Sequence, residues 1–132
     1  MVARVVDVQD VNAWTKAGVM IRQTLGAGSA HAALLVTPGK GLAFQRRGST
    51  GGASRSTAVA GVAPYWVRLV RSGQVVRASI SIDGSSWTSV GQDTIALSGG
   101  VWVGMVVSSH DVAQLARATF DHVAISESAA PR

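Results

Sequence analysis

The feature of this sequence that most constrains its fold is an alternation of apolar and polar residues, rich in β-branched side chains and interrupted every 8 to 14 residues by a turn signal. A period of two is typical of β-strands with one buried face. The pattern predicts nine strands: Val2–Val8, Ala17–Leu25, His31–Thr37, Leu42–Arg47, Tyr65–Arg71, Gln74–Asp83, Thr88–Leu97, Val101–Ser108 and Arg117–Ser126. We expect a long loop over residues 48–56. This many short strands in one all-β chain favours a sandwich or a barrel.

The length and composition fit a single domain. The chain has 132 residues, 47% of them hydrophobic and 14% charged, and a chain of this size buries about two thirds of its unfolded surface. The absence of cysteine excludes disulfides, thiol nucleophiles and zinc sites built on thiolates. No apolar run approaches the roughly 20 residues of a membrane helix, and we see no signal peptide. We therefore expect one domain over residues 1–132, with a flexible tail from about residue 127 and no membrane partner.

The charge is strongly basic. Ten Arg and two Lys face seven acidic residues, which gives a formal net charge of +5 at pH 7. A basic surface attracts nucleic acids, anionic glycans or anionic lipids, although arginines dispersed over a solvated surface give the same count. The basic residues are densest at Arg46-Arg47 and in the group Arg68, Arg71 and Arg77. Nucleic-acid binding needs aromatic side chains between the basic ones on one face. With seven aromatic residues in the chain, it is disfavoured.

One hairpin can be predicted residue by residue. A two-residue turn at Ser72-Gly73 pairs Leu69 with Val76 and Arg68 with Arg77. One face is then apolar and carries Val67, Leu69, Val76, Ala78, Ile80 and Ile82. The other face carries Trp66, Arg68, Val70, Val75, Arg77, Ser79 and Ser81. We expect the apolar face to lie in the core, since alternate side chains of a strand point to opposite faces.

The polar face of this hairpin is the most suggestive surface in the sequence. Arg68 opposite Arg77 places two like charges side by side, which is unfavourable. Such a pair calls for a compensating acidic side chain, an anionic ligand or a polyhydroxyl ligand, and Trp66 beside it supplies an aromatic plate. The alternative is that a loop covers Trp66 and that the arginines bond to Asp121 or to backbone carbonyls.

Six segments taken together carry a resemblance to a known family. They are Trp14–Arg22, Gly41–Arg47, Tyr65–Arg71, Ser81–Trp87, Val103–His110 and Ala118–Val123. Their order and spacing resemble a concanavalin A-like jelly-roll domain of the lectin/glucanase superfamily, an accessory module of secreted bacterial glycosidases and other extracellular proteins. The resemblance covers about residues 2–126. It implies an antiparallel β-sandwich with a concanavalin A-like jelly-roll topology and an extracellular location.

The start of the chain departs from the pattern of that family. Its members usually carry further strands before the segment that matches Val2–Val8, where this chain begins with Met1. A sandwich without those strands exposes a sheet edge or an open apolar face. A second copy would cover it, and two-fold pairing is the commonest form of oligomer. We therefore expect a homo-oligomer.

The sequence disfavours an enzyme. Glycosidases need two carboxylates about 5 to 10 Å apart, but the chain has a single glutamate, Glu127, and no predicted strand presents two carboxylates on one face. A hydrolase triad needs Ser, His and Asp side chains that converge, whereas Ser109-His110-Asp111 are neighbours that point apart. The three histidines lack metal-ligand spacing. We expect no cofactor or metal, with only a weak calcium signal at His110-Asp111.

The segment Ser81-x-Asp83-Gly84-x-x-Trp87 resembles the Asp-box hairpin of sialidases. In that hairpin the Asp and the Ser organise the turn and the Trp packs beneath it. The resemblance therefore implies a structural role. A propeller would need several such copies, and this chain has one.

The family resemblance implies non-catalytic carbohydrate binding. A sugar ring stacks its apolar face on Trp, and its hydroxyls bond to polar side chains. The candidate ligand-binding residues are Trp66, Arg68, Arg77, Arg22, Gln45 and Arg47. If Phe44 lies in the core, alternation places Gln45 and Arg47 together on the outer face. Trp102 lies on a strand that is apolar on both faces, which fits the core or an oligomer interface, and Trp14 is expected to begin a strand and pack.

The alternative function belongs to a different class. It is a structural β-sandwich unit that self-assembles to replace the missing strands and binds no small molecule. The tryptophan and valine surfaces would then be interfaces. A stable monomer in size-exclusion chromatography with light scattering would remove this alternative.

Overall fold

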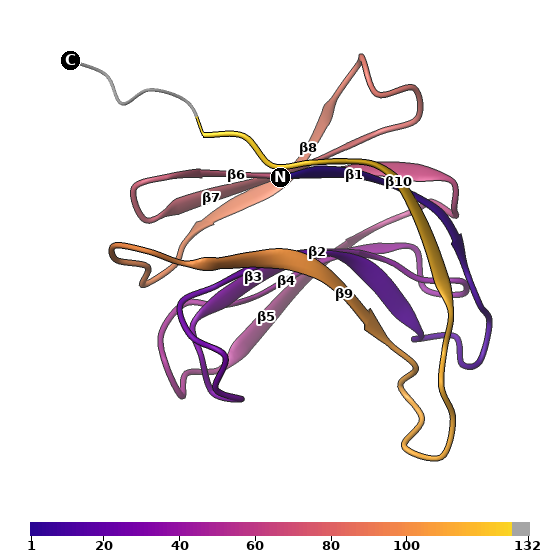
Figure 1. The fold of residues 1–132 in the computed structure, drawn as a ribbon, viewed down its shortest axis with the longest axis horizontal. Coiled ribbons are helices and arrows are strands. Elements are labelled where there is room, and N and C mark those ends of the chain that lie inside the picture. The colour runs from indigo at the N-terminus through magenta and orange to yellow at the C-terminus, as the bar shows by residue number, and fades with distance from the viewer. Residues whose placement is uncertain (128–132) are drawn as a thin grey trace.

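The computed structural model describes residues 1–127 and shows an antiparallel β-sandwich (Figure 1). Its strands are β1 (Val2–Val8), β2 (Lys16–Arg22), β3 (His31–Val36), β4 (Leu42–Arg47), β5 (Ser54–Val59), β6 (Tyr65–Ser72), β7 (Val75–Ser81), β8 (Thr88–Thr94), β9 (Trp102–Ser108) and β10 (Ala118–Ala124). The predicted all-β antiparallel sandwich is confirmed. In the described part of the chain, no helix is long and apolar enough to cross a membrane. The tail predicted from about residue 127 lies, beyond Glu127, outside the described residues.

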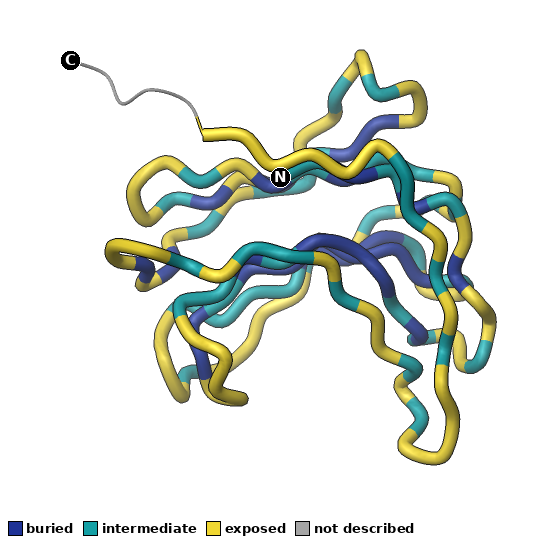
Figure 2. Tube along the Cα trace, viewed as in Figure 1, coloured by how far each residue is buried: buried dark blue, intermediate teal, exposed yellow. Residues whose placement is uncertain are grey.

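The strands form two sheets of five. The first sheet has the order β10-β1-β6-β7-β8, and the second sheet has the order β5-β4-β3-β2-β9. Apolar side chains from both sheets fill the space between them, among them Val5, Leu69 and Val76 from the first sheet and Val19, Leu34 and Phe44 from the second. Figure 2 shows buried segments of the two layers facing each other. This single core is what the alternating pattern predicts.

The turn between β6 and β7 differs from the predicted one. It lies at Gly73-Gln74 instead of Ser72-Gly73, so that Ser72 pairs with Val75. Gly73 has a φ of +61°, and a type II′ turn requires a positive φ at its first central residue, where glycine is favoured. The predicted turn would have put serine at that position. The true turn therefore starts one residue later.

This change of register separates the two arginines that were predicted to face each other. Arg68 lies opposite Ser79, and Arg77 lies opposite Val70. The predicted pairing of like charges is therefore wrong. A shift by a whole pair of residues keeps every side chain on its predicted face, so Arg68 and Arg77 still share the outer face of the first sheet.

Several strand boundaries differ from the prediction. Ile82, predicted to lie in the core, is 79% exposed because β7 ends at Ser81. Strand β5 was missed, since its first half fell within the predicted loop. It is an edge strand with a mostly exposed, polar sequence, and it pairs only with β4. Trp14 does not begin a strand, because β2 starts at Lys16.

The outer face of the second sheet is concave. Figure 1 shows this sheet arching, with its ends curving away from the first sheet. Phe44 is fully buried between the sheets. Alternation along β4 therefore turns Gln45 and Arg47 to the concave face, as predicted. Trp102, at the start of edge strand β9, is 57% exposed, so it is not a core residue.

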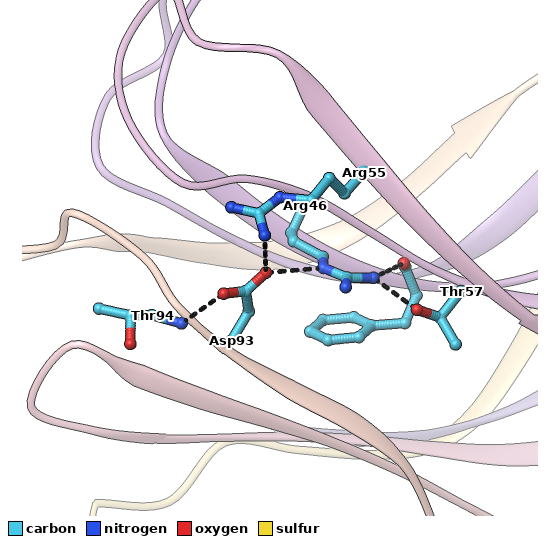
Figure 3. Close-up of polar contacts among 6 residues, drawn as sticks. Arg46, Arg55, Thr57, Asp93 and Thr94 are labelled. Atoms are coloured by element: carbon cyan, nitrogen blue, oxygen red, sulfur yellow. Dashed lines mark hydrogen bonds and ion pairs between the residues drawn. The ribbon is translucent and has the colours of Figure 1, made fainter.

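An ion pair joins the two sheets where β4 and β5 approach β8 (Figure 3). Arg46 Nε donates a 3.0 Å hydrogen bond to Asp93 Oδ2, and Arg55 Nη1 lies 3.7 Å from the same oxygen. The guanidinium of Arg46 also stacks over the Phe44 ring at 4.8 Å and donates to the Thr57 hydroxyl at 2.7 Å. The hydrogen bond from Arg46 lowers the pKa of Asp93 below its ordinary value, because it stabilises the carboxylate.

Candidate ligand-binding faces

The six candidate residues divide between the two sheets. Trp66 and Arg68 lie on β6 and Arg77 lies on β7, so these three belong to the outer face of the first sheet. The other three, Arg22, Gln45 and Arg47, lie on β2 and β4 and belong to the concave face of the second sheet. The apolar core separates the two faces. The structure therefore brings each set of three together but does not bring the two sets to one site.

Trp66 is half-buried, with a neighbour against it on two sides. The His122 ring lies against it with the ring centroids 5.0 Å apart. On another side it packs against Gly84, where a Cβ atom would come within 2.8 Å of the indole. The guanidinium that binds Asp121 comes from Arg4 on β1, and not from Arg68 or Arg77. The indole thus lies between a loop and a strand.

The two candidate arginines of the first sheet, Arg68 and Arg77, have separate partners. The Arg68 guanidinium stacks on the Trp87 ring at 4.1 Å, and within the described chain its Nε has no hydrogen-bond partner. Arg77 Nε donates to Gln92 Oε1 at 3.1 Å. Because Arg68 and Arg77 are not directly opposite each other, no ligand is needed to compensate their charges.

Ser81 and Asp83 organise the turn of the hairpin at residues 81–87, as the Asp-box resemblance implies, whereas the indole that packs against Gly84 is that of Trp66. The Ser81 hydroxyl accepts a 2.9 Å hydrogen bond from the Gly84 N–H. The Asp83 carboxylate accepts from the N–H groups of Ser85 and Ser86 at 2.8 and 2.9 Å. These backbone donors lower the pKa of Asp83 to about 2. The Asp83 carboxylate therefore stabilises the turn through hydrogen bonds to its backbone.

The concave face carries a row of basic side chains. Strand pairing places Arg22 of β2 opposite His31 of β3, and His31 opposite Arg47 of β4. The same register continues to Trp102 of β9 at one end and Ser54 of β5 at the other. Residues directly opposite in neighbouring strands share a face. We call Arg22, His31 and Arg47 the basic row, and Trp102 is its aromatic end.

The two arginines of the basic row are fixed by loop carbonyls. Arg22 donates to the carbonyls of Thr24 and Gly26, at 3.1 and 2.6 Å. Arg47 donates to those of Gly52 and Ala27, at 3.0 and 2.9 Å. A guanidinium has five N–H donors, so each arginine holds the adjacent loops in place and keeps further donors for another molecule.

His31 adds a hydrogen-bond acceptor to the row. Its Nδ1 lies 3.1 Å from the Ser29 carbonyl. Because a carbonyl only accepts, Nδ1 carries the proton in the neutral ring and Nε2 is left as an acceptor. Burial lowers the pKa of His31 below its usual 6.5, and the charges of Arg22 and Arg47 add to that shift. The ring is therefore neutral at pH 7.

A hollow of about 180 Å³ lies at the aromatic end of the row. It is lined by Met20, Arg22, Leu25, Trp102, Val103, Gly104 and Met105. A Cβ atom at Gly104 would meet nothing within 4 Å, so the strand itself leaves this space open. An apolar surface therefore adjoins the charged row, which suits a ligand with one apolar and one polar side.

Sequence reasoning did not assign His31 and Trp102 to a ligand site. Both belong to the row only because of strand register, and the register depends on β2 pairing with β3 on one side and with β9 on the other. The sequence places His31 and Arg47 at positions that face the same side of the sheet if β3 and β4 are paired in this register. Without knowledge of that pairing, the sequence alone could not identify the row.

The weak calcium signal at His110-Asp111 falls in the loop between β9 and β10. There the Asp111 carboxylate accepts hydrogen bonds from the Ala113 N–H at 2.9 Å and the Gln114 side chain at 3.1 Å. Across residues 1–127, no group of three or more His, Cys, Asp or Glu side chains is arranged to hold a metal ion.

Comparisons with known proteins bear on the fold. No protein-family model matches the sequence, and no curated protein matches it. A mutant of the GH43 protein BlXynB from Bacillus licheniformis has a TM-score of 0.68 and 16% sequence identity, over 91% of this chain and 26% of that chain. A functionally unknown protein from Saccharomyces cerevisiae has a TM-score of 0.59 and 21% identity, over 80% of this chain and 57% of that chain. This chain thus spans less than two thirds of either structure and shares the fold of the parts that it matches.

Proposed function

We propose that this chain is a non-catalytic, lectin-like module that binds carbohydrate on the concave face of the second sheet. The observation that carries the proposal is the continuous row of Trp102, Arg22, His31 and Arg47 across four strands. A sugar ring offers an apolar face that stacks on tryptophan, and hydroxyls that both donate and accept. Along the row, the platform is followed by a donor group, an acceptor and a second donor group.

The structural similarity supports the same class of function. BlXynB is a GH43 protein, a designation of glycoside hydrolases, and this chain matches about a quarter of it. A concanavalin A-like jelly roll carried as an accessory, extracellular module accounts for the partial match and for the six sequence segments. Binding without catalysis is supported by the sequence, in which no predicted strand presents two carboxylates on one face.

The ligand would enter at the hollow beside Trp102. Its ring would stack on the indole, which is 57% exposed, and its substituents would reach Arg22 and then His31 along the row. Gln45 lies on the same face, opposite Ser56 and two residues before Arg47 on β4. Its side-chain amide offers both a donor and an acceptor. Of the six residues predicted from the sequence, this site uses Arg22, Gln45 and Arg47.

A polysaccharide binding screen tests the proposal. The wild type is compared with Trp102→Ala and with Ile82→Ala, which removes an exposed apolar side chain just beyond the end of β7, away from the concave face. Stacking of one ring on an indole predicts about tenfold weaker binding for Trp102→Ala and no change for Ile82→Ala. A folded wild type that binds no neutral or acidic glycan would remove the proposal.

A second candidate function, self-assembly through β9, rests on a different observation. Of the four edge strands in the described chain, β5, β8 and β10 contain charged residues, and β9 contains none. Charge on an edge strand discourages pairing with another chain. Met105 and Val107 of β9 lie opposite the buried Val19 and Ala17 of β2, yet they are 53% and 42% exposed. The first sheet leaves these inward-facing side chains uncovered.

We propose a second copy of the chain as the occupant of this edge. Antiparallel pairing of β9 with β9 is self-complementary under a two-fold axis, and it would continue the second sheet from one copy into the other. A hollow of about 570 Å³ beside β9, with Ile21, Leu69, Val103 and Ile125 in its lining, leaves room for side chains of the partner.

Light scattering after size-exclusion chromatography tests the second candidate. The wild type is expected to be a dimer and Met105→Lys a monomer, because a charge would be buried at the pairing edge. Ser89→Lys, on edge strand β8, is the control and should remain a dimer. A monomeric wild type would remove self-assembly and leave carbohydrate binding unaffected.

A further inference from the structure

The strands that form the concave face carry basic side chains and no acidic ones. The five strands of the second sheet contain no Asp or Glu, whereas strands of the first sheet contain Asp7, Asp93 and Asp121. The segments 23–30 and 48–53, which Arg22 and Arg47 hold, also contain no acidic residue. Apart from the arginines of the basic row, Lys16 of β2 shares the parity of Arg22.

The charges of Arg22 and Arg47 are not neutralised within the described chain. The ion pairs of residues 1–127 involve Arg4, Arg46, Arg55 and His122, and neither arginine of the basic row takes part. Their partners are backbone carbonyls, which orient the guanidinium groups without cancelling their charge. This differs from Arg4 of the first sheet, whose charge is paired with Asp121.

The spacing of the row suits a chain of sugar residues. Arg22 and Arg47 are separated by His31, so their Cα atoms lie two strand spacings apart, about 10 Å. The neutral His31 between them accepts a hydrogen bond from a hydroxyl instead of repelling or attracting an anion. The order of groups is therefore cation, acceptor, cation, with Trp102 as the platform at one end.

We infer that the glycan bound by this face is acidic, with an anionic group on the sugar ring held by Arg22 or Arg47. This inference rests on the proposed carbohydrate-binding function. Guanidinium groups bind carboxylates and sulfates through charge-assisted, often bidentate hydrogen bonds. Because loop carbonyls already orient these arginines, their side chains lose little conformational entropy when such a group binds. A polymer of uronic acids is the ligand class that places one carboxylate on each ring.

The test compares polygalacturonate with its carboxyl-reduced form, which keeps the rings and removes the charge. We expect polygalacturonate to bind about tenfold more tightly at low salt, and this preference to shrink as sodium chloride rises. Dextran sulfate against dextran distinguishes sulfate from carboxylate as the anion. Equal binding of polygalacturonate and its reduced form would overturn the inference while leaving carbohydrate binding intact. Binding to no glycan would instead remove the proposed function.

Charge variants locate the effect on the concave face. Arg47→Gln should lose about tenfold in affinity for polygalacturonate and little for the reduced polymer. Arg77→Gln on the first sheet changes the net charge equally and should have no effect. Equal losses in the two variants would show attraction by net charge alone and would contradict the site.

A second variant avoids the loop contacts of Arg47. Ser54 is exposed and lies opposite Arg47, so Ser54→Glu would pair with that arginine and compete with an anionic ligand. We expect about tenfold weaker binding of polygalacturonate. Ser89→Glu, on exposed edge strand β8, is the matched control. Unchanged binding in a folded Ser54→Glu protein would contradict the inference.

Discussion

Asp93 shows how a single residue joins the two layers of this molecule. Its carboxylate meets Arg46 from the opposite sheet, and the two side chains are only 17% and 14% exposed. Removing one partner of a largely buried pair leaves the other charge uncompensated. Residues of this kind therefore matter more to stability than the arginines that face solvent.

Replacing Asp93 is expected to destabilise the fold clearly. Asp93→Ala should lower the free energy of unfolding by about 2 to 3 kcal/mol, since Arg46 would stay buried without its partner. Asp121→Ala is the control, because the Arg4–Asp121 pair is about one third exposed, and it should destabilise the fold clearly less than Asp93→Ala. Urea denaturation followed by tryptophan fluorescence measures both. Equal effects of the two substitutions would contradict the account.

At the scale of residues, the sequence predicts which face of a sheet a side chain lies on better than it predicts which distant residues that side chain contacts. Alternation assigned Phe44 to the core and Gln45 and Arg47 to the outer face, and the structure agrees. It could not show that His122, far away in the sequence, packs on Trp66. Side-chain contacts between distant segments depend on which strands become neighbours, and alternation within one strand carries no information about that.

Strand β9 shows what is decided at the scale of an element. It forms the edge of the second sheet, and its Gly104 leaves the hollow beside Trp102 open. The sequence showed only that this segment is apolar on both faces. Its position at an edge, and hence the exposure of Trp102, follows from sheet order.

Filling the hollow should block the ligand without harming the fold. Gly104→Leu places a side chain in open space on the concave face, and Gly104 does not adopt the positive φ that would strain it. We expect carbohydrate binding to fall by about tenfold or more and stability to change by less than about 1 kcal/mol. Titration calorimetry and urea denaturation check the two parts. Normal glycan affinity in this variant would place the ligand elsewhere.

Turn chemistry explains the elements that were predicted imperfectly. The segment Ser72-Gly73-Gln74 allows two adjacent turns, and the requirement for positive φ at the first central residue selects the one that begins with Gly73. Strand β5 was missed because its exposed, polar residues resemble a loop. Its pairing with β4 is a tertiary interaction, and such interactions override weak local preferences.

The free energy of unfolding of the whole molecule is expected to decrease at acid pH. Contacts in the folded state lower the pKa of Asp83 to about 2 and lower those of Asp93 and Asp121 as well. The unfolded chain, with ordinary values near 3.8, therefore binds more protons as the pH falls below about 5. These carboxylates stabilise the fold above pH 4 and lose that effect towards pH 2.

The urea midpoint should accordingly fall steadily from pH 5 to pH 2.5. His31 acts in the same direction from pH 6.5 downwards, because its pKa in the folded protein is also lowered. Denaturation curves at half-unit intervals of pH measure the trend. A midpoint that is constant or rises across this range would show that the carboxylates are not stabilised in the folded state.

At the scale of the molecule, the sequence predicted the class of fold but not the position of the candidate site. The alternating pattern and the turn signals were sufficient for an antiparallel sandwich. The six candidate residues were grouped by their chemistry. In the structure three lie on the outer face of the first sheet and three on the concave face of the second. Which strands enter which sheet is a long-range property, so only a structure could show that Arg22, His31 and Arg47 form one row.

The most direct test of the central claim is to map a bound glycan by amide chemical-shift perturbation. A short oligogalacturonate and a neutral galactan oligomer are titrated in parallel into ¹⁵N-labelled wild-type protein. The account predicts that the shifted amides lie on β2, β3, β4 and β9, and that among the four tryptophan indoles only that of Trp102 moves. Shifts centred on Trp66 and β7 would contradict it, because they would place the ligand on the opposite sheet.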